Sequence, residues 1–211
     1  MKKIKFSCPV IINQLEDSKY INKKLLNFFD ICDSETIKIA DGYEIKGDVF
    51  PDSFAKLDFY SCNDYERPWV KFFLPYLKEE LKIIANSLWY DNFSFKGIWF
   101  QQYEKNNTHG WHIHAENYTG VYYVDLNHIS PKTEIINPYD NKTISTMKVK
   151  TGDVLLFPSF FIHRAPPVTN DCKKTIVSFN LNFTKPSQEL FLRERISYNF
   201  YDKFKKICKI L

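Results

Sequence analysis

Three of the five histidines in this chain crowd into one short stretch, THGWHIH, at residues 108–114. In an extended strand, residues two apart point to the same side, so His112 and His114 would share one face while Ile113 points away. Two imidazoles side by side at a strand end form one edge of a metal site. A pair of surface or hydrogen-bonded histidines without a metal fits this stretch equally well when it is considered alone.

A further histidine, His163, ends an apolar segment in KTGDVLLFPSFFIHRAPPV, residues 150–168. The pattern predicts a turn at Gly152, an apolar strand and a break at Pro158 before the histidine. A core histidine with one hydrogen bond is the ordinary interpretation of such a residue. In a small barrel, however, a segment 49 residues after His114 can return beside it. His163 would then complete the kind of facial ligand set that iron(II) uses, with other coordination positions left open.

The next segment, DCKKTIVSFN at residues 171–180, brings cations to the start of an apolar strand. Alternation predicts that Lys174 lies on one face of this strand and Lys173 on the other. An ammonium group in an apolar strand is costly to bury unless it is paired, and it suits a site that receives a carboxylate. We assign this role to Lys174 and expect Lys173 to be solvated.

The composition describes a globular protein with a large core, because 44% of its 211 residues are hydrophobic and 17% are aromatic. The net charge of +4 arises from 29 basic and 25 acidic residues, without the dense basic stripe that nucleic-acid-binding proteins usually carry. No apolar run is long enough for a signal peptide or approaches the ~18 residues of a membrane span. Five separated cysteines without CxxC spacing predict neither a zinc knuckle nor a disulfide framework, and favour a cytoplasmic location.

The predicted secondary structure of the segments that must position these side chains changes near residue 95. Before it the sequence predicts an α+β region, with helices at 22–32 and 67–89 and a strand at 44–51. Pro68 suits the first turn of the second helix, whereas Pro75 predicts a kink or a later start. After residue 95 the apolar period is two, and closely spaced strands without helices predict an antiparallel sandwich or barrel. The expected strands are 93–106, 119–127, 133–139, 145–159 and 174–183.

The order of the motifs HxH, GVYYV, GDVLLFPSFFIH, a basic residue eleven positions after the histidine and SFN resembles the iron(II)/2-oxoglutarate-dependent oxygenases. It is most similar to the small prolyl-hydroxylase-like members of bacteria and phages. The resemblance covers roughly residues 96–184. It implies a mainly β fold with flanking helices, built as a double-stranded β-helix of the jelly-roll or cupin-like type. We expect an N-terminal extension at 1–95, a catalytic core at 96–184 and a helical tail at 185–211, together forming one structural domain.

The resemblance also implies a hydroxylase that uses Fe(II), 2-oxoglutarate as co-substrate and O2. On this basis the metal ligands, which are also the catalytic residues, are His112, His114 and His163. Lys174 would hold the far carboxylate of 2-oxoglutarate, and Tyr123 would add a hydroxyl group, with Tyr122 as the second choice.

The strand before the histidines carries Gln101 and Tyr103, which would line the pocket if their face of the strand looks inward. No marker identifies that face, and we expect Tyr103 to belong to the core.

The ligand set departs from the wider superfamily, which uses His-x-Asp or His-x-Glu with a distal histidine. Here His114 occupies the carboxylate position after His112. The alternative set is His114, Glu116 and His163, because HAE is itself a His-x-Glu motif. We prefer the first set, which keeps both histidines of the most similar subfamily in place.

The cupins are the main alternative family, since they also combine an HxH motif with a later histidine in a β-barrel. Gly152, Pro158 and His163 nearly fit the second cupin motif, but Phe160 stands where that motif has glycine. No glutamate follows His114 at the cupin spacing, and cupins have no need of Lys174. A metal-free β-barrel that binds a partner is the third alternative, and it requires the histidines to be incidental.

The sequence does not identify the substrate, because substrate contacts would come from loops and the N-terminal extension. We expect the substrate to be a peptide or a small molecule, and we expect no binding to nucleic acid or to a membrane. A homodimer through the C-terminal tail is an option that the apolar residues of that tail leave open.

Overall fold

The computed structural model describes residues 8–31 and 52–193 of the chain, and in this part ten strands form two antiparallel sheets. The larger sheet has the strand order β1-β8-β5-β10-β3-β2 and the smaller one β4-β9-β6-β7. In chain order the strands are β1 (Ile11–Gln14), β2 (Lys56–Leu57), β3 (Tyr90–Tyr103), β4 (His109–His112), β5 (Tyr118–Leu126), β6 (Glu134–Ile136), β7 (Ile144–Thr146), β8 (Asp153–Pro158), β9 (His163–Ala165) and β10 (Lys174–Pro186).

The centre of the larger sheet is the long strand β10, which pairs with β5 on one side and β3 on the other. Its first residues are buried on both faces, as is every residue of β8. Strand β8 is apolar after Asp153, as expected where no face meets water. The buried part of β10 also contains polar residues, among them Lys174 and Ser178. Gly120 on β5 allows close packing at this centre, since a Cβ atom there would lie 2.0 Å from the ring of Phe179.

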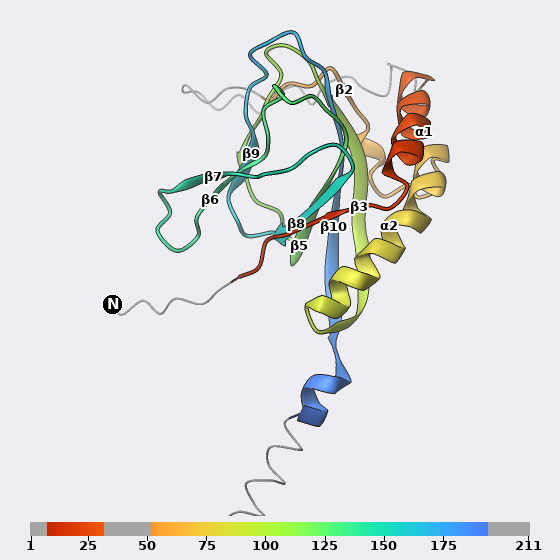
Figure 1. Ribbon diagram of the computed structural model, residues 1–211, viewed down its shortest axis with the longest axis vertical. Coiled ribbons are helices and arrows are strands. Elements are labelled where there is room, and N and C mark those ends of the chain that lie inside the picture. Colours follow the sequence, from red (N-terminus) through yellow and green to blue (C-terminus); the bar gives the residue numbers. More distant parts are fainter. Residues whose placement is uncertain (1–7, 32–51, 194–211) are drawn as a thin grey trace, which may run out of the picture.

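Two helices, α1 (Ser18–Ile31) and α2 (Pro68–Ser87), cover one face of the larger sheet (Figure 1). Helix α1 confirms the helix expected near residues 22–32. The late start considered for α2 is wrong, because the helix begins at Pro68 and continues through Pro75. Pro75 is exposed, so the carbonyl group that loses its helical partner there can bond water instead.

The smaller sheet lies on the other face of the larger sheet, where a second apolar cluster fills the space between them (Figure 1). This cluster includes Val121, Leu155 and Ile176 of the larger sheet and Ile135 and Ala165 of the smaller one. The mainly β architecture with flanking helices is therefore confirmed. The strand expected at 145–159 is two strands, β7 and β8, because the turn around Gly152 separates them. The strand expected at 44–51 lies outside the described residues.

The helical tail expected at 185–211 is described as far as residue 193. Residues 185 and 186 still belong to β10, and residues 188–193 are helical. The rest of the tail, and with it the expected dimer contact, lies outside the described residues. Within the described part of the chain, no helix is long and apolar enough to cross a membrane. The division into extension, core and tail stays a prediction, and α1 and α2 pack on the same sheet that carries the core strands.

Candidate active site

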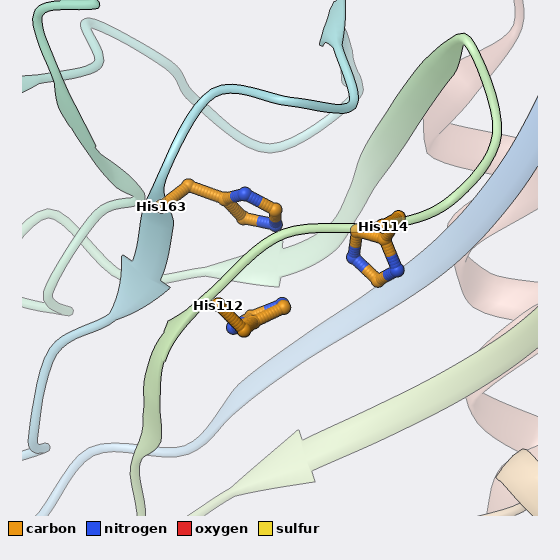
Figure 2. A group of neighbouring side chains, drawn as sticks. All are labelled: His112, His114 and His163. Carbon is orange, nitrogen blue, oxygen red and sulfur yellow. The ribbon is translucent and has the colours of Figure 1, made fainter.

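Three histidines, from β4, from the segment just after it and from β9, lie close together (Figure 2). His112 ends β4 and lies opposite His163, the first residue of β9, in the antiparallel pairing of the smaller sheet. His114 follows two residues after β4, where its backbone N–H donates to the carbonyl oxygen of Ser159. One ligand atom from each imidazole lies within 4.8 Å of the other two. A single metal ion fits such a set of donors.

The hydrogen bonds of two of these imidazoles decide which nitrogen faces the centre. His112 Nδ1 lies 2.7 Å from the carbonyl oxygen of Gly110, and His163 Nδ1 lies 2.9 Å from that of Phe161. A carbonyl oxygen only accepts, so each Nδ1 carries the hydrogen and each Nε2 keeps its lone pair. This is the arrangement in which metal-binding histidines are usually held.

The third imidazole, that of His114, is held by a buried polar chain. The side-chain amide of Asn180 lies 3.2 Å from Nδ1 of His114. The hydroxyl of Thr119 donates to Asn180 over 3.0 Å and contacts the hydroxyl of Ser159 at 2.8 Å. Sequence reasoning missed Asn180 in this role, although the SFN motif that contains it was recognised.

Burial favours the neutral form of all three imidazoles. Desolvation lowers the pKa of His114 to about 4 and that of His163 to about 3, and it also lowers the pKa of His112. The neighbouring imidazoles add to this effect for His114 and His163. At neutral pH the site therefore offers lone pairs without first losing protons, as metal binding requires.

Glu116, the carboxylate of the alternative ligand set, does not belong to this group of potential ligands. It is partly buried, and its charge acts on the thiol of Cys62, whose pKa it helps to raise after desolvation. The local reason is the direction of the chain, which turns from His114 toward β5 and carries residue 116 out of the group. The geometry thus favours the set with two neighbouring histidines.

The histidines form one wall of a pocket between the sheets. Its other walls include Trp99, Gln101, Tyr103, Thr133, Ile176 and Ser178. Gln101 is held in place because its side-chain oxygen accepts a 2.9 Å hydrogen bond from the hydroxyl of Ser178. A concave site in which directed polar groups stand between apolar side chains suits a small polar ligand.

Lys174 is fully buried at the start of β10, whereas Lys173 is exposed, as the alternation predicted. The Lys174 ammonium donates to the carbonyl oxygen of Pro131 over 3.0 Å and lies 4.9 Å from the centre of the Tyr103 ring. Desolvation lowers the pKa of Lys174 to about 8. A buried cation with one carbonyl partner is costly, and a carboxylate in the adjoining pocket would compensate it.

The two tyrosines of GVYYV point to opposite faces of the larger sheet. Tyr122 bonds to Asn22 of α1 over 2.6 Å, on the helix-covered face. The Tyr123 hydroxyl lies 2.6 Å from that of Thr133, which lines the pocket. Tyr123 is therefore the tyrosine on the side of the histidines. Thr133 was not expected from the sequence, and nothing in the segment before β6 marks it.

Tyr103 combines both interpretations that the sequence left open, since it is 1% exposed and also lines the pocket. Its hydroxyl is buried and has no hydrogen-bond partner within the described part of the chain. Buried polar groups are rarely unpaired in this way unless a ligand or water completes them. The unpaired hydroxyl, the Lys174 ammonium and the Tyr123–Thr133 pair together fit the far carboxylate of 2-oxoglutarate.

Comparison with protein families places this site in a known context. Residues 97–180 match the family described as putative 2OG-Fe(II) oxygenase. This range contains the three histidines, Lys174 and Tyr123. No curated protein matches the chain.

Solved structures with the same fold share little sequence with the chain. A viral collagen prolyl hydroxylase from Paramecium bursaria Chlorella virus 1, in its 2-oxoglutarate complex, is 12% identical, with a TM-score of 0.57 over 83% of this chain and 96% of that one. A Pseudomonas putida prolyl-4-hydroxylase is also 12% identical, with a TM-score of 0.56 over 82% and 93%. HygX from Streptomyces hygroscopicus, with nickel and 2-oxoglutarate bound, is 10% identical, with a TM-score of 0.55 over 85% and 83%.

These structures confirm the double-stranded β-helix, and the family match favours the oxygenases over the cupins. Fe(II) and 2-oxoglutarate are the cofactors of this family, and the donor set of the site fits both. The segment that carries the histidines therefore matches the iron(II)/2-oxoglutarate-dependent oxygenases in sequence, and the fold of the chain agrees with theirs.

Proposed function

We propose that the protein is a hydroxylase in which His112, His114 and His163 hold Fe(II) and Lys174 anchors 2-oxoglutarate. The observation that carries the proposal is the convergence of three neutral imidazoles beside a pocket lined by Tyr103, whose ring lies 4.9 Å from the buried ammonium of Lys174. Iron and 2-oxoglutarate together supply the power to oxidise an unactivated C–H bond with O2. The chain supplies ligation, orientation and exclusion of water.

Each group of residues has a distinct task in this proposal. The carbonyl groups of Gly110 and Phe161 fix the His112 and His163 rings so that Nε2 faces the iron. Lys174 and the hydroxyl groups of Tyr103 and Tyr123 would bind the far carboxylate and set the direction of the co-substrate. The remaining wall of the pocket, with Trp99 and Gln101, then limits the space in which a substrate C–H bond can approach.

The substrate is a peptide or a small molecule. The similar structures include enzymes named for both classes, since two are prolyl hydroxylases and HygX is also described with hygromycin B bound. We therefore propose a screen that contains proline-rich peptides, free amino acids and polar metabolites. Release of succinate above the substrate-free rate identifies a substrate even before its oxidised product has been characterised.

The decisive experiment measures 2-oxoglutarate consumption without any further substrate. Anaerobic addition of Fe(II) and 2-oxoglutarate should give a weak visible charge-transfer band, and admission of O2 should remove it and release succinate. The matched controls are His163→Ala, which loses a proposed ligand, and His128→Ala, which changes a histidine outside the group. A wild-type protein with neither the band nor succinate above the His163→Ala level would exclude this function and favour a cupin-like metal site.

The ligand set is tested by a second pair of variants. His112→Ala should abolish turnover and weaken Fe(II) binding strongly, because it removes one of three donors. Glu116→Ala should have a much smaller effect. If the two variants exchange these phenotypes, the iron ligands are His114, Glu116 and His163, and His112 acts only on its neighbours.

A further inference from the structure

A carboxylate outside the ligand group, that of Asp52, holds the segment that presents His112. Its Oδ1 accepts a 2.7 Å hydrogen bond from the backbone N–H of Gly110. Its Oδ2 lies 3.6 Å from Nε2 of His109. The segment that carries Asp52 is itself fixed by a β-bridge, in which Ser53 and Thr108 exchange backbone hydrogen bonds of 2.9 and 3.0 Å.

Both residues that Asp52 contacts, Gly110 and His109, also contact His112. The carbonyl oxygen of Gly110 accepts the hydrogen of His112 Nδ1. The His109 ring is stacked on the His112 ring, with centroids 3.8 Å apart and planes inclined by 18°. The ring of Phe54 packs edge-on against the His109 ring, with the two centroids 5.3 Å apart. Movement of the Asp52 carboxylate would therefore be transmitted to His112 through both neighbours.

The Asp52 carboxylate also brings a negative charge close to the proposed metal site. Three neutral imidazoles leave the two positive charges of a bound metal uncompensated, whereas His-x-Asp and His-x-Glu sites place a carboxylate among the ligands. Asp52 is acidic, close to the group and half-exposed at 48% of its side-chain surface. Its charge acts on His112, where it opposes the lowering of the pKa by desolvation.

We infer that Asp52 is a positioning residue of the metal site, which aims His112 through Gly110 and His109 and supplies the negative charge that the three ligands lack. This inference rests on the proposed ligand set. It assigns to a residue 60 positions before His112 the outer-shell role that carboxylates commonly have beside metal-binding histidines.

The test uses metal affinity in the absence of 2-oxoglutarate, so that it does not depend on turnover. Co(II) is titrated into the full-length protein and followed by calorimetry and by its visible absorption, which reports the coordination geometry. Asp52→Asn keeps the size and an acceptor for the Gly110 N–H but removes the charge. We expect a 10- to 100-fold loss of Co(II) affinity, the usual range for outer-shell partners. Asp52→Glu should recover at least part of it.

The control is Asp140→Asn, because Asp140 also accepts backbone N–H groups, from Lys142 and Thr143, but lies in an exposed turn. It should leave the Co(II) affinity unchanged. An Asp52→Asn protein that is folded by circular dichroism and binds Co(II) as tightly as the wild type overturns the inference. If the wild type itself binds no metal, the proposed ligand set fails instead, and the two failures are thereby distinguished.

Discussion

The two faces of the larger sheet bury side chains of different kinds. On the helix-covered face, the cluster beneath α1 and α2 consists of apolar and aromatic side chains such as Phe29, Phe73 and Phe179. On the face toward the smaller sheet, the buried side chains include Lys174, Gln101, Ser178 and His163. The change occurs between adjacent residues of β5, where Tyr122 bonds to a helix and Tyr123 to a residue of the pocket.

The difference separates stability from function. Apolar burial on the helix side stabilises the fold by roughly 25 cal/mol per Å² of surface removed from water. Buried polar groups on the other side need partners that the protein supplies only in part, as the Tyr103 hydroxyl shows. The helix-covered face therefore stabilises the sheet, and the opposite face uses some of that stability to keep a ligand site assembled.

The largest expected effect on stability comes from Phe73→Ala on the helix side. Phe73 is fully buried, and its ring lies 4.9 Å from that of Tyr122. Removing such a ring costs about 3–5 kcal/mol, which thermal or urea unfolding would detect. Co(II) affinity of the folded fraction should not change, and a large loss of affinity would contradict the separation of the two faces. Phe73→Leu offers a milder version if the alanine variant does not fold.

Lys174→Met should weaken the binding of 2-oxoglutarate and should not destabilise the fold. We expect the apparent KM for 2-oxoglutarate to rise by a factor on the order of 30 or more, since a desolvated charge pair loses one partner at a cost of about 2–5 kcal/mol. The apoprotein should become more stable by about 1–3 kcal/mol, because the pKa of about 8 shows that burial disfavours this ammonium. Lys173→Met is the matched control and should change neither quantity. A destabilised Lys174→Met apoprotein would mean that the lysine is structural.

The binding of 2-oxoglutarate should weaken as pH rises from 7 to 9. The pKa of Lys174 is lowered to about 8, so about nine-tenths of the ammonium is protonated at pH 7 and about one-tenth at pH 9, which gives roughly a 10-fold loss of affinity. Stability should move the other way, rising between pH 8 and 10.5, where the unfolded chain still holds the proton and the folded chain has released it. Calorimetric titration with Mn(II) present measures the affinity. Lys174→Arg keeps its charge throughout, and a sloping profile in that variant would assign the effect to another group.

The two adjacent tyrosines give the smallest effects and the sharpest comparison. Tyr123→Phe should raise the KM for 2-oxoglutarate several-fold, because the lost hydroxyl group lies beside Thr133 in the pocket. Tyr122→Phe should leave that KM unchanged and lower the stability by about 1 kcal/mol, because Asn22 loses its hydrogen bond. Equal effects of the two substitutions on KM would contradict the assignment of the tyrosines to opposite faces.

The sequence by itself determined the period of the strands, the resemblance to the oxygenases and the side chains that carry the proposed chemistry. Alternation separated Lys174 from Lys173 correctly, because a strand directs neighbouring side chains to opposite faces. The same local rule placed His112 and His114 together, and motif order identified His163 as their distant partner.

Only the tertiary structure decided between alternatives that depend on contacts across the chain. Local sequence did not distinguish Tyr122 from Tyr123, because that choice depends on which face of β5 the helices cover. It could not exclude Glu116 from the ligand group either, because the turn after His114 is fixed by the Ser159 carbonyl, 45 residues away. Asp52, Asn180 and Thr133 reach the site through strand pairing and packing between the sheets. Their residue types are ordinary in loops and strands, and their roles arise only where the folded chain brings them beside the histidines.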